Sequence, residues 1–287
     1  METTSQLAVR LSRASRKLFY DVYNHFDWPE QLVEGAWCMP PELISIHGTP
    51  AWDAMTEAQR KRLSLYEICN LFSLVLQGER PLVAGLSDRL YQRQNDRDIT
   101  TYLHHFLDEE NKHMVMFGEF CHRYIGKVYP EKKISLPREY AKGEEEVAFF
   151  CKVMVVEELG DYYNLEIGRD ERCDPLVREL NKVHHVDEAR HLAFGRLYLT
   201  ELFERYRAGW TDEQLAGFRS WLVEYLRASW GDYYNPTMYR DAGLADGYEL
   251  RQMALSHPAA AAHRQRASAK IVTYFIQNGL LAEEPRL

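Results

Sequence analysis

Two tetrapeptides in this chain, at residues 110–113 and 188–191, both read Glu-x-x-His. In each case another glutamate lies 31 residues upstream, Glu79 before Glu110 and Glu157 before Glu188. Each glutamate interrupts an apolar pattern of helical period, and residues i and i+3 share one face of a helix. The repeated interval therefore predicts two similar half-sites, each built by a pair of helices.

His184 adds a third imidazole, because it lies four residues before Glu188 and seven before His191 on the same helical face. So many ionisable groups in an apolar seam are very unfavourable unless cations compensate their charge. A glutamate from each of two helices plus Glu-x-x-His from each of two others is the arrangement of di-iron and di-manganese carboxylate proteins. We therefore expect two metal ions, held by Glu79, Glu110, His113, Glu157, His184, Glu188 and His191.

The donor set favours iron or manganese, because carboxylate oxygens and imidazoles suit these metals and no cysteine is placed to ligate. We expect two iron ions, with manganese as the alternative, since bridging carboxylates can shift as iron cycles between its ferrous and ferric states. An acidic residue directly precedes each Glu-x-x-His motif. From the crossed symmetry of such bundles we expect Asp187 to orient His113 and Glu109 to orient His191.

Four long helices are predicted to carry these residues, at about 56–91, 98–127, 143–167 and 175–207. Thr56 is the expected cap of the first, and residues 94–98 the turn that follows it. Two residues meet at the same level of an antiparallel helix pair when they are equally far from its turn. Turns near 94–96 and 171–173 put each upstream glutamate about 15 residues from the turn, level with its partner.

Further elements are expected to cover this four-helix bundle. A leading helix at about 5–24 precedes a proline-rich, largely irregular arm at 27–52 whose tryptophans should pack against the body. A fifth helix begins at Thr211 and runs to about 230, and a last helix covers 258–278, with loops at 235–236 and 243–247 between them. We predict one all-α domain over 1–287, with its metal-binding core at about 60–205.

Composition narrows the possible partners. The 35 basic and 43 acidic residues give a net charge of -8, without the basic face that nucleic-acid binding needs. The first residues lack the pattern of a secretory signal, and no apolar run is long enough to span a bilayer. Five scattered cysteines without a C-x-x-C pair favour free thiols in a reducing compartment. We expect a soluble cytoplasmic protein with no nucleic-acid or membrane partner.

The Asp-Glu-Ala-Arg-His stretch at 187–191 and the Leu-Gln-Gly-Glu stretch at 76–79 resemble the ferritin-like di-iron oxygenases. Among these, the histidine at 184 resembles the p-aminobenzoate N-oxygenase family. The resemblance covers about 60–205 and implies a ferritin-like fold with the same seven ligands. It also implies that two Fe(II) ions bind O2 as a peroxo-di-iron(III) species and oxygenate an amine to hydroxylamine, nitroso or nitro products, in specialised metabolism. An external electron donor or reductase and a homodimer are further expectations.

Other functions stay open on the sequence alone. A di-iron hydroxylase or desaturase acting on C–H bonds would use similar ligands. A ferritin-like protein that oxidises or stores iron is disfavoured by the extra histidine and the appended helices. A helical scaffold without metal would leave the buried charges unexplained.

Three ligand assignments have rivals nearby in the sequence. Glu67 also lies among leucines, but it would meet the second helix about three turns away from the metals. Glu158 has apolar neighbours too, and only the repeated interval selects the preceding glutamate. His185 lies one step around the helix from His184, away from the face of the Glu-x-x-His motif.

Overall fold

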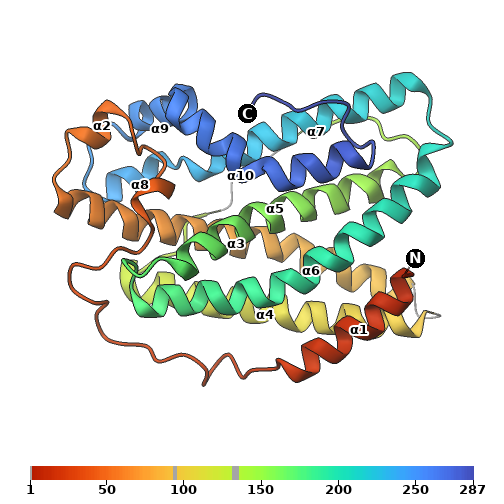
Figure 1. Cartoon of the computed structure of the whole chain (residues 1–287), viewed down its shortest axis with the longest axis horizontal. Coiled ribbons are helices and arrows are strands. Elements are labelled where there is room, and N and C mark those ends of the chain that lie inside the picture. Colours follow the sequence, from red (N-terminus) through yellow and green to blue (C-terminus); the bar gives the residue numbers. More distant parts are fainter. Residues whose placement is uncertain (1, 93–95, 131–135) are drawn as a thin grey trace.

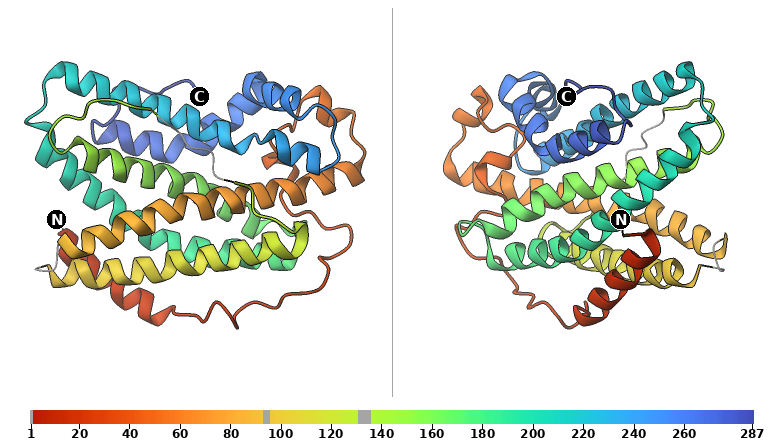
Figure 2. Two further views of the ribbon diagram at one scale, coloured as in Figure 1. Left: turned by 180° about the vertical axis from the view of Figure 1, so that it is seen from behind. Right: turned by 45° about the vertical axis from the view of Figure 1, so that its right-hand side comes forward.

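The computed structural model describes residues 2–92, 96–130 and 136–287, and these residues form helices and loops without a β-strand (Figure 1). Four long helices make the centre: α3 (Glu57–Gln92), α4 (Arg97–Ile125), α5 (Glu144–Arg169) and α6 (Pro175–Arg207). Helix α3 packs along α4 and α5 packs along α6, as two helical hairpins laid together (Figure 2). The predicted all-α four-helix bundle is confirmed.

Local capping explains where these helices begin. The Thr56 hydroxyl accepts a hydrogen bond from the Gln59 N–H at 3.3 Å, and the Gln59 side chain accepts one from the Thr56 N–H at 2.9 Å, so Thr56 caps α3 as predicted. Asp96 caps α4 through the Ile99 N–H. The predicted turn at 94–98 falls partly on 93–95, which lie outside the described residues.

The leading helix is shorter than predicted. Helix α1 (Thr4–Lys17) ends at Lys17, whereas the pattern had predicted a helix to about residue 24. Asp21 accepts hydrogen bonds from the Tyr23 N–H and the Asn24 side chain, a local turn that competes with helix formation. The consequence is that apolar side chains after Lys17 reach the surface, with Phe19 66% and Tyr23 74% exposed.

The region predicted as loops at 235–236 and 243–247 contains two further helices, α8 (Pro236–Asp241) and α9 (Gly247–Ser256). The Asn-Pro pair, interpreted from sequence as a loop, begins α8 instead. Asn235 caps it by accepting from the Thr237 N–H, and Pro236 takes the first helical position, where a missing N–H does no harm.

Outer helices cover the bundle on two sides, as predicted. Helices α7 (Asp212–Tyr233) and α10 (Pro258–Gln277) lie over α5, and α7 also contacts α3, while α1 packs on α4 and α6 at the other side (Figure 1). The irregular arm includes η1 (Pro41–Leu43) and α2 (Pro50–Asp53), and exchanges backbone hydrogen bonds with the turn before α6 through Trp37. None of the described helices is both long and apolar enough to cross a membrane.

Helices α3 and α5 approach closely next to Glu79. A Cβ atom on Gly78 would lie 2.9 Å from Val156 Cγ1, and one on Gly85 would lie 2.5 Å from the Phe149 ring, so a larger residue at either position would force the facing side chain to shift. Helix α3 also runs through Pro81, which has no N–H to donate to the carbonyl four residues earlier. Helix α3 therefore has small residues at its contact with α5 and lacks one internal hydrogen bond at Pro81.

Candidate metal centre

The seven residues predicted as ligands meet in the interior of the four-helix bundle, and each is at most 5% exposed. Their side chains form two groups whose donor atoms all lie within 4.8 Å of one another: Glu79, His113, His184 and Glu188, and Glu110, Glu157, Glu188 and His191. Glu188 belongs to both groups. Its Oε1 lies 2.8 Å from His184 Nε2 and its Oε2 lies 3.3 Å from His191 Nδ1. A carboxylate so placed can face two cations at once.

The atoms that face the centre lie close to one another, but none of them makes a hydrogen bond of suitable geometry among the described residues. They are both carboxylate oxygens of Glu79, Glu110 and Glu188, Oε1 of Glu157, Nδ1 of His113 and His191, and Nε2 of His184. Buried polar atoms are almost always hydrogen-bonded, so a cluster of exceptions needs an explanation. Oxygen and imidazole nitrogen atoms that converge without partners fit two metal ions bound between them.

Hydrogen bonds behind the cluster orient the imidazoles. His113 Nε2 lies 3.1 Å from Asp187 Oδ2, and His191 Nε2 lies 2.9 Å from Glu109 Oε2. Each acid thus accepts from one ring nitrogen and leaves Nδ1 as the free ligand atom. The two acids lie where the sequence analysis expected them.

His184 is oriented differently, because its Nδ1 lies 3.0 Å from Asn164 Oδ1 on α5 and its Nε2 faces the cluster. Sequence reasoning missed Asn164, although it lies seven residues after Glu157, on the same face of α5.

Arg190 joins the two acids, and sequence reasoning gave it no role. Its Nη2 donates to Glu109 Oε1 at 2.5 Å and also to Asp187, so one buried guanidinium holds both carboxylates. The sequence did indicate this contact, because Arg190 lies three residues after Asp187 on the same helical face. Tyr20 also reaches this group, donating its hydroxyl to Asp187 Oδ2 at 3.2 Å.

The rival residues lie elsewhere. Glu158 pairs with Arg196 on α6, and His185 Nδ1 lies 2.5 Å from Asp161 Oδ1. Glu67 accepts a hydrogen bond from the Ser45 N–H at 3.1 Å, away from the cluster. The structure therefore brings together Glu157, Glu79 and His184, not their neighbours.

Electrostatics in the cluster depend on burial and on the neighbouring charges. Burial, reinforced by the Glu188 and Glu110 carboxylates, raises the pKa of Glu157 well above its usual value. Burial also acts to raise the pKa of Glu188, but His191 and His184 outweigh it and hold that pKa well below the usual value. Burial acts to lower the pKa of His191, but the Glu188 and Glu110 carboxylates outweigh it and raise that pKa well above its usual value. Metal binding to these imidazoles would compete with protons.

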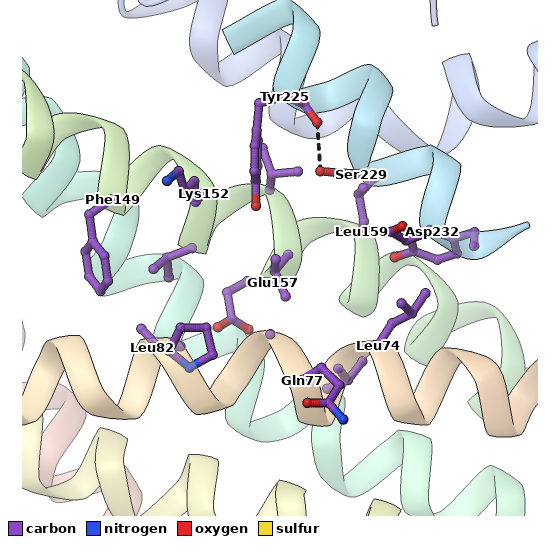
Figure 3. Close-up of a pocket in the computed structure, with 17 residues that line it drawn as sticks. Leu74, Gln77, Leu82, Phe149, Lys152, Glu157, Leu159, Tyr225, Ser229 and Asp232 are labelled. Carbon is purple, nitrogen blue, oxygen red and sulfur yellow. Dashed lines mark hydrogen bonds between the residues drawn. The ribbon is translucent and has the colours of Figure 1, made fainter. Parts of the chain in front are cut away.

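A cavity of about 340 Å³ extends from the cluster to the surface between α3, α5 and α7. Figure 3 shows Glu157 pointing from α5 toward α3, between Leu82 and Gln77, so this carboxylate belongs to both the cluster and the cavity wall. Most other walls are apolar side chains, and Gln77, Ser229 and Asp232 are further polar groups of the lining. Lys152 also lines the cavity; its Nζ lies 5.7 Å from the Trp221 ring centroid, and the structure records no ion pair for it within the described ranges.

Comparison with known proteins places this geometry in context. Uncharacterized proteins of Mycobacterium bovis and Mycobacterium tuberculosis are 26% identical over 216 residues, which cover 70% of this chain and 62% of each relative. An R2-like ligand-binding oxidase without metal cofactor matches with a TM-score of 0.50 and 12% identity over 96% of both chains, which supports the shared ferritin-like helical fold. A variant with an anaerobically reconstituted Mn/Fe cofactor matches with a TM-score of 0.48 and 13% identity over 91% of this chain and 93% of its own.

The family model described as P-aminobenzoate N-oxygenase AurF matches residues 1–279. The match covers nearly the whole chain and agrees with the buried carboxylate and histidine cluster, which fits a dimetal site. The chain therefore belongs to the P-aminobenzoate N-oxygenase AurF family.

Proposed function

We propose that this protein is a non-heme di-iron monooxygenase that N-oxygenates a small amine, either an arylamine or an amino-acid-like molecule. The observation that carries the proposal is the third imidazole, because His184 lies with Glu79, His113 and Glu188 in one group of donor atoms. The family description supports a nitrogen atom as the target. A cytoplasmic homodimer that acts in specialised metabolism and takes its electrons from an external donor is part of the same proposal.

Two iron ions would be held by the seven clustered residues, of which Glu188 belongs to both groups of donor atoms, and manganese is the alternative metal. When bound, they would supply the activation of dioxygen. Asp187 and Glu109 would keep Nδ1 of His113 and His191 directed at the metals by accepting from the opposite ring nitrogen. Arg190 would keep both of these acids ionised and in position.

The cavity that ends on Glu157 would bind the substrate. Its apolar walls favour the neutral amine, whose free electron pair is the nucleophile, over the ammonium ion. Lys152 would pair with an acidic group at the other end of the molecule, since this ammonium has no carboxylate partner in the described part of the chain. Lys152 and Glu157 are five positions apart on α5, which is about 7.5 Å along the helix axis. A single substituted ring would fit this distance.

Labelled oxygen provides the test. The full chain is loaded with Fe(II) without air, its iron content is measured, and it is mixed with 18O2, a reductant and a panel of aminobenzoates and amino acids. We expect two iron ions per chain and one amine that gains 18O on nitrogen. Label on carbon would overturn the proposal in favour of a hydroxylase. Continued Fe(II) oxidation with no amine converted would overturn it in favour of an iron-oxidising protein.

A further inference from the structure

Exposed apolar side chains gather where α1 ends. Leu18, Phe19, Tyr23 and Val186 are between 43% and 74% exposed, although large apolar residues are usually buried. With the exception of Tyr23, they line an open hollow of about 610 Å³, which we call the α1 hollow, formed by residues 17–21, 24–25, 182–183 and 186–187. A contiguous exposed apolar surface of this kind marks an interaction site.

The floor of the α1 hollow is connected to the metal centre by hydrogen bonds. Tyr20 and Asp187 both line the hollow. The Tyr20 hydroxyl donates to Asp187 Oδ2 at 3.2 Å, and the same oxygen lies 3.1 Å from His113 Nε2. The other nitrogen of that imidazole, Nδ1, lies 3.4 Å from Glu188 Oε1 inside the cluster. A continuous path of three side chains therefore leads from the surface to a proposed metal ligand.

The exposed charges at the opening are more basic than acidic. Lys17 and Lys182 are the exposed lysines of the lining, and one acid of the lining, Asp187, is buried and paired with Arg190. Asp21 is the exposed carboxylate of the lining, and it is engaged by the Tyr23 N–H and the Asn24 side chain. This basic rim stands out in a chain whose net charge is -8. It is complementary to an acidic partner.

We propose that the α1 hollow is the docking site of a small acidic electron-transfer protein of the ferredoxin class, and that its electrons reach the metal centre through Tyr20, Asp187 and His113. The inference rests on the proposed function, which consumes electrons. Each reduced carrier loses one electron, so two encounters supply the two electrons that convert a pair of ferric ions into a pair of ferrous ions. A second copy of this chain is a poorer occupant, because both surfaces would carry the same excess of exposed cations, Lys17 and Lys182 against Asp21.

Binding is measured first, because it does not depend on turnover. The full chain, with and without iron, is titrated calorimetrically with an oxidised plant-type [2Fe–2S] ferredoxin. Phe19→Glu should weaken binding by about tenfold or more, since it places an acid in the apolar centre of the site. Tyr248→Glu is the matched control, because Tyr248 is 69% exposed on α9 and lies outside the α1 hollow. No binding to the wild-type chain, or equal effects of the two variants, would overturn the proposal.

Electron transfer is measured next by rapid mixing of the ferric protein with reduced ferredoxin, or with reduced methyl viologen as a small donor. Tyr20→Phe removes the hydroxyl but keeps the ring, so at saturating ferredoxin we expect roughly tenfold slower reduction. Phe19→Glu should slow ferredoxin but not methyl viologen. An unchanged rate in Tyr20→Phe would refute the path. Conversion of a dimer to a monomer by Phe19→Glu in sedimentation would reassign the surface to self-association.

The experiments distinguish an error in the proposed N-oxygenation from an error in the proposed docking site. If no amine is N-oxygenated but ferredoxin binds and reduces the protein as described, the docking site stands and only the oxygenation reaction is wrong. If an amine is oxygenated with a chemical reductant while ferredoxin does not bind, the docking proposal alone is wrong.

Discussion

The cluster can be approached from two sides of the bundle, and the two approaches differ in kind. On the α7 side, an apolar cavity reaches Glu157, one of the clustered carboxylates itself. On the α1 side, an open hollow stops at Asp187, one hydrogen bond behind His113. A substrate must touch the reacting atoms, whereas an electron needs only a connected path. The α7 side therefore has the features of a substrate route and the α1 side those of an electron route.

The largest effect is expected from Glu188→Ala, which removes the carboxylate shared by both groups of donor atoms. Without it neither group is complete, so we expect less than one iron per chain after anaerobic loading, and loss of both ferredoxin oxidation and amine conversion. Metal analysis and oxygen uptake measure the two results. Glu67→Gln, which changes a buried acid outside the cluster, is the control and should keep two iron ions per chain. Full iron content in Glu188→Ala would contradict the assigned centre.

A change confined to the α7 side is Lys152→Met, which keeps the aliphatic stem and removes the charge. Losing a charge-assisted contact should raise KM for an acidic amine about 10- to 100-fold. KM for an uncharged amide analogue should not change, and neither should the rate of reduction by ferredoxin. Lys270→Met, at an exposed position of α10, is the matched control. Equal KM changes for the acid and the amide would remove Lys152 from substrate recognition.

The α7 and α1 sides were not equally visible in the sequence. Helix periodicity and the 31-residue interval determine which residues share a level and a face, so the seven clustered residues and the two acids behind them could be named in advance. The same reasoning predicted the bounds of α6 closely. Periodicity works here because each half-site lies within one helical hairpin.

Features that depend on contacts between distant segments could not be predicted in this way. Tyr20 meets Asp187 across 167 positions of the chain, and only the early end of α1 brings it there. The cavity needs α7 to lie over α3 and α5, together with the close approach at Gly78. Helix α8 was missed because an Asn-Pro pair occurs both in turns and at helix N-termini. Helix α9 was missed because it begins at a glycine, without a side-chain cap.

Glu67 is a buried acid outside both the α7-side cavity and the α1 hollow, so changing it should alter stability without altering metal binding. Burial raises the pKa of Glu67 to about 8, against the opposing effect of its hydrogen bonds from Ser45. The folded chain thus keeps a proton that the unfolded chain loses near pH 4.5, so this group's contribution to stability falls as pH rises from about 4.5 to 8. We expect Glu67→Gln to gain stability relative to the wild type over this range, by several kcal/mol at most, as measured by urea unfolding. If the free energy of unfolding of the two proteins changed in the same way with pH, this prediction would be wrong.

The smallest expected effect is the interaction between the two sides. Lys152 lines the cavity beside α7, whereas Tyr20 lines the α1 hollow, and within the described part of the chain neither side chain contacts a recorded partner of the other. In the double variant Lys152→Met, Tyr20→Phe, the KM change and the slower reduction should each match their single variants, with a coupling energy below about 0.5 kcal/mol. Steady-state KM values and rapid-mixing rates measure the two quantities independently. A larger coupling energy would mean that substrate binding on the α7 side alters the hydrogen bonds around His113. The cavity and the α1 hollow would then be energetically coupled.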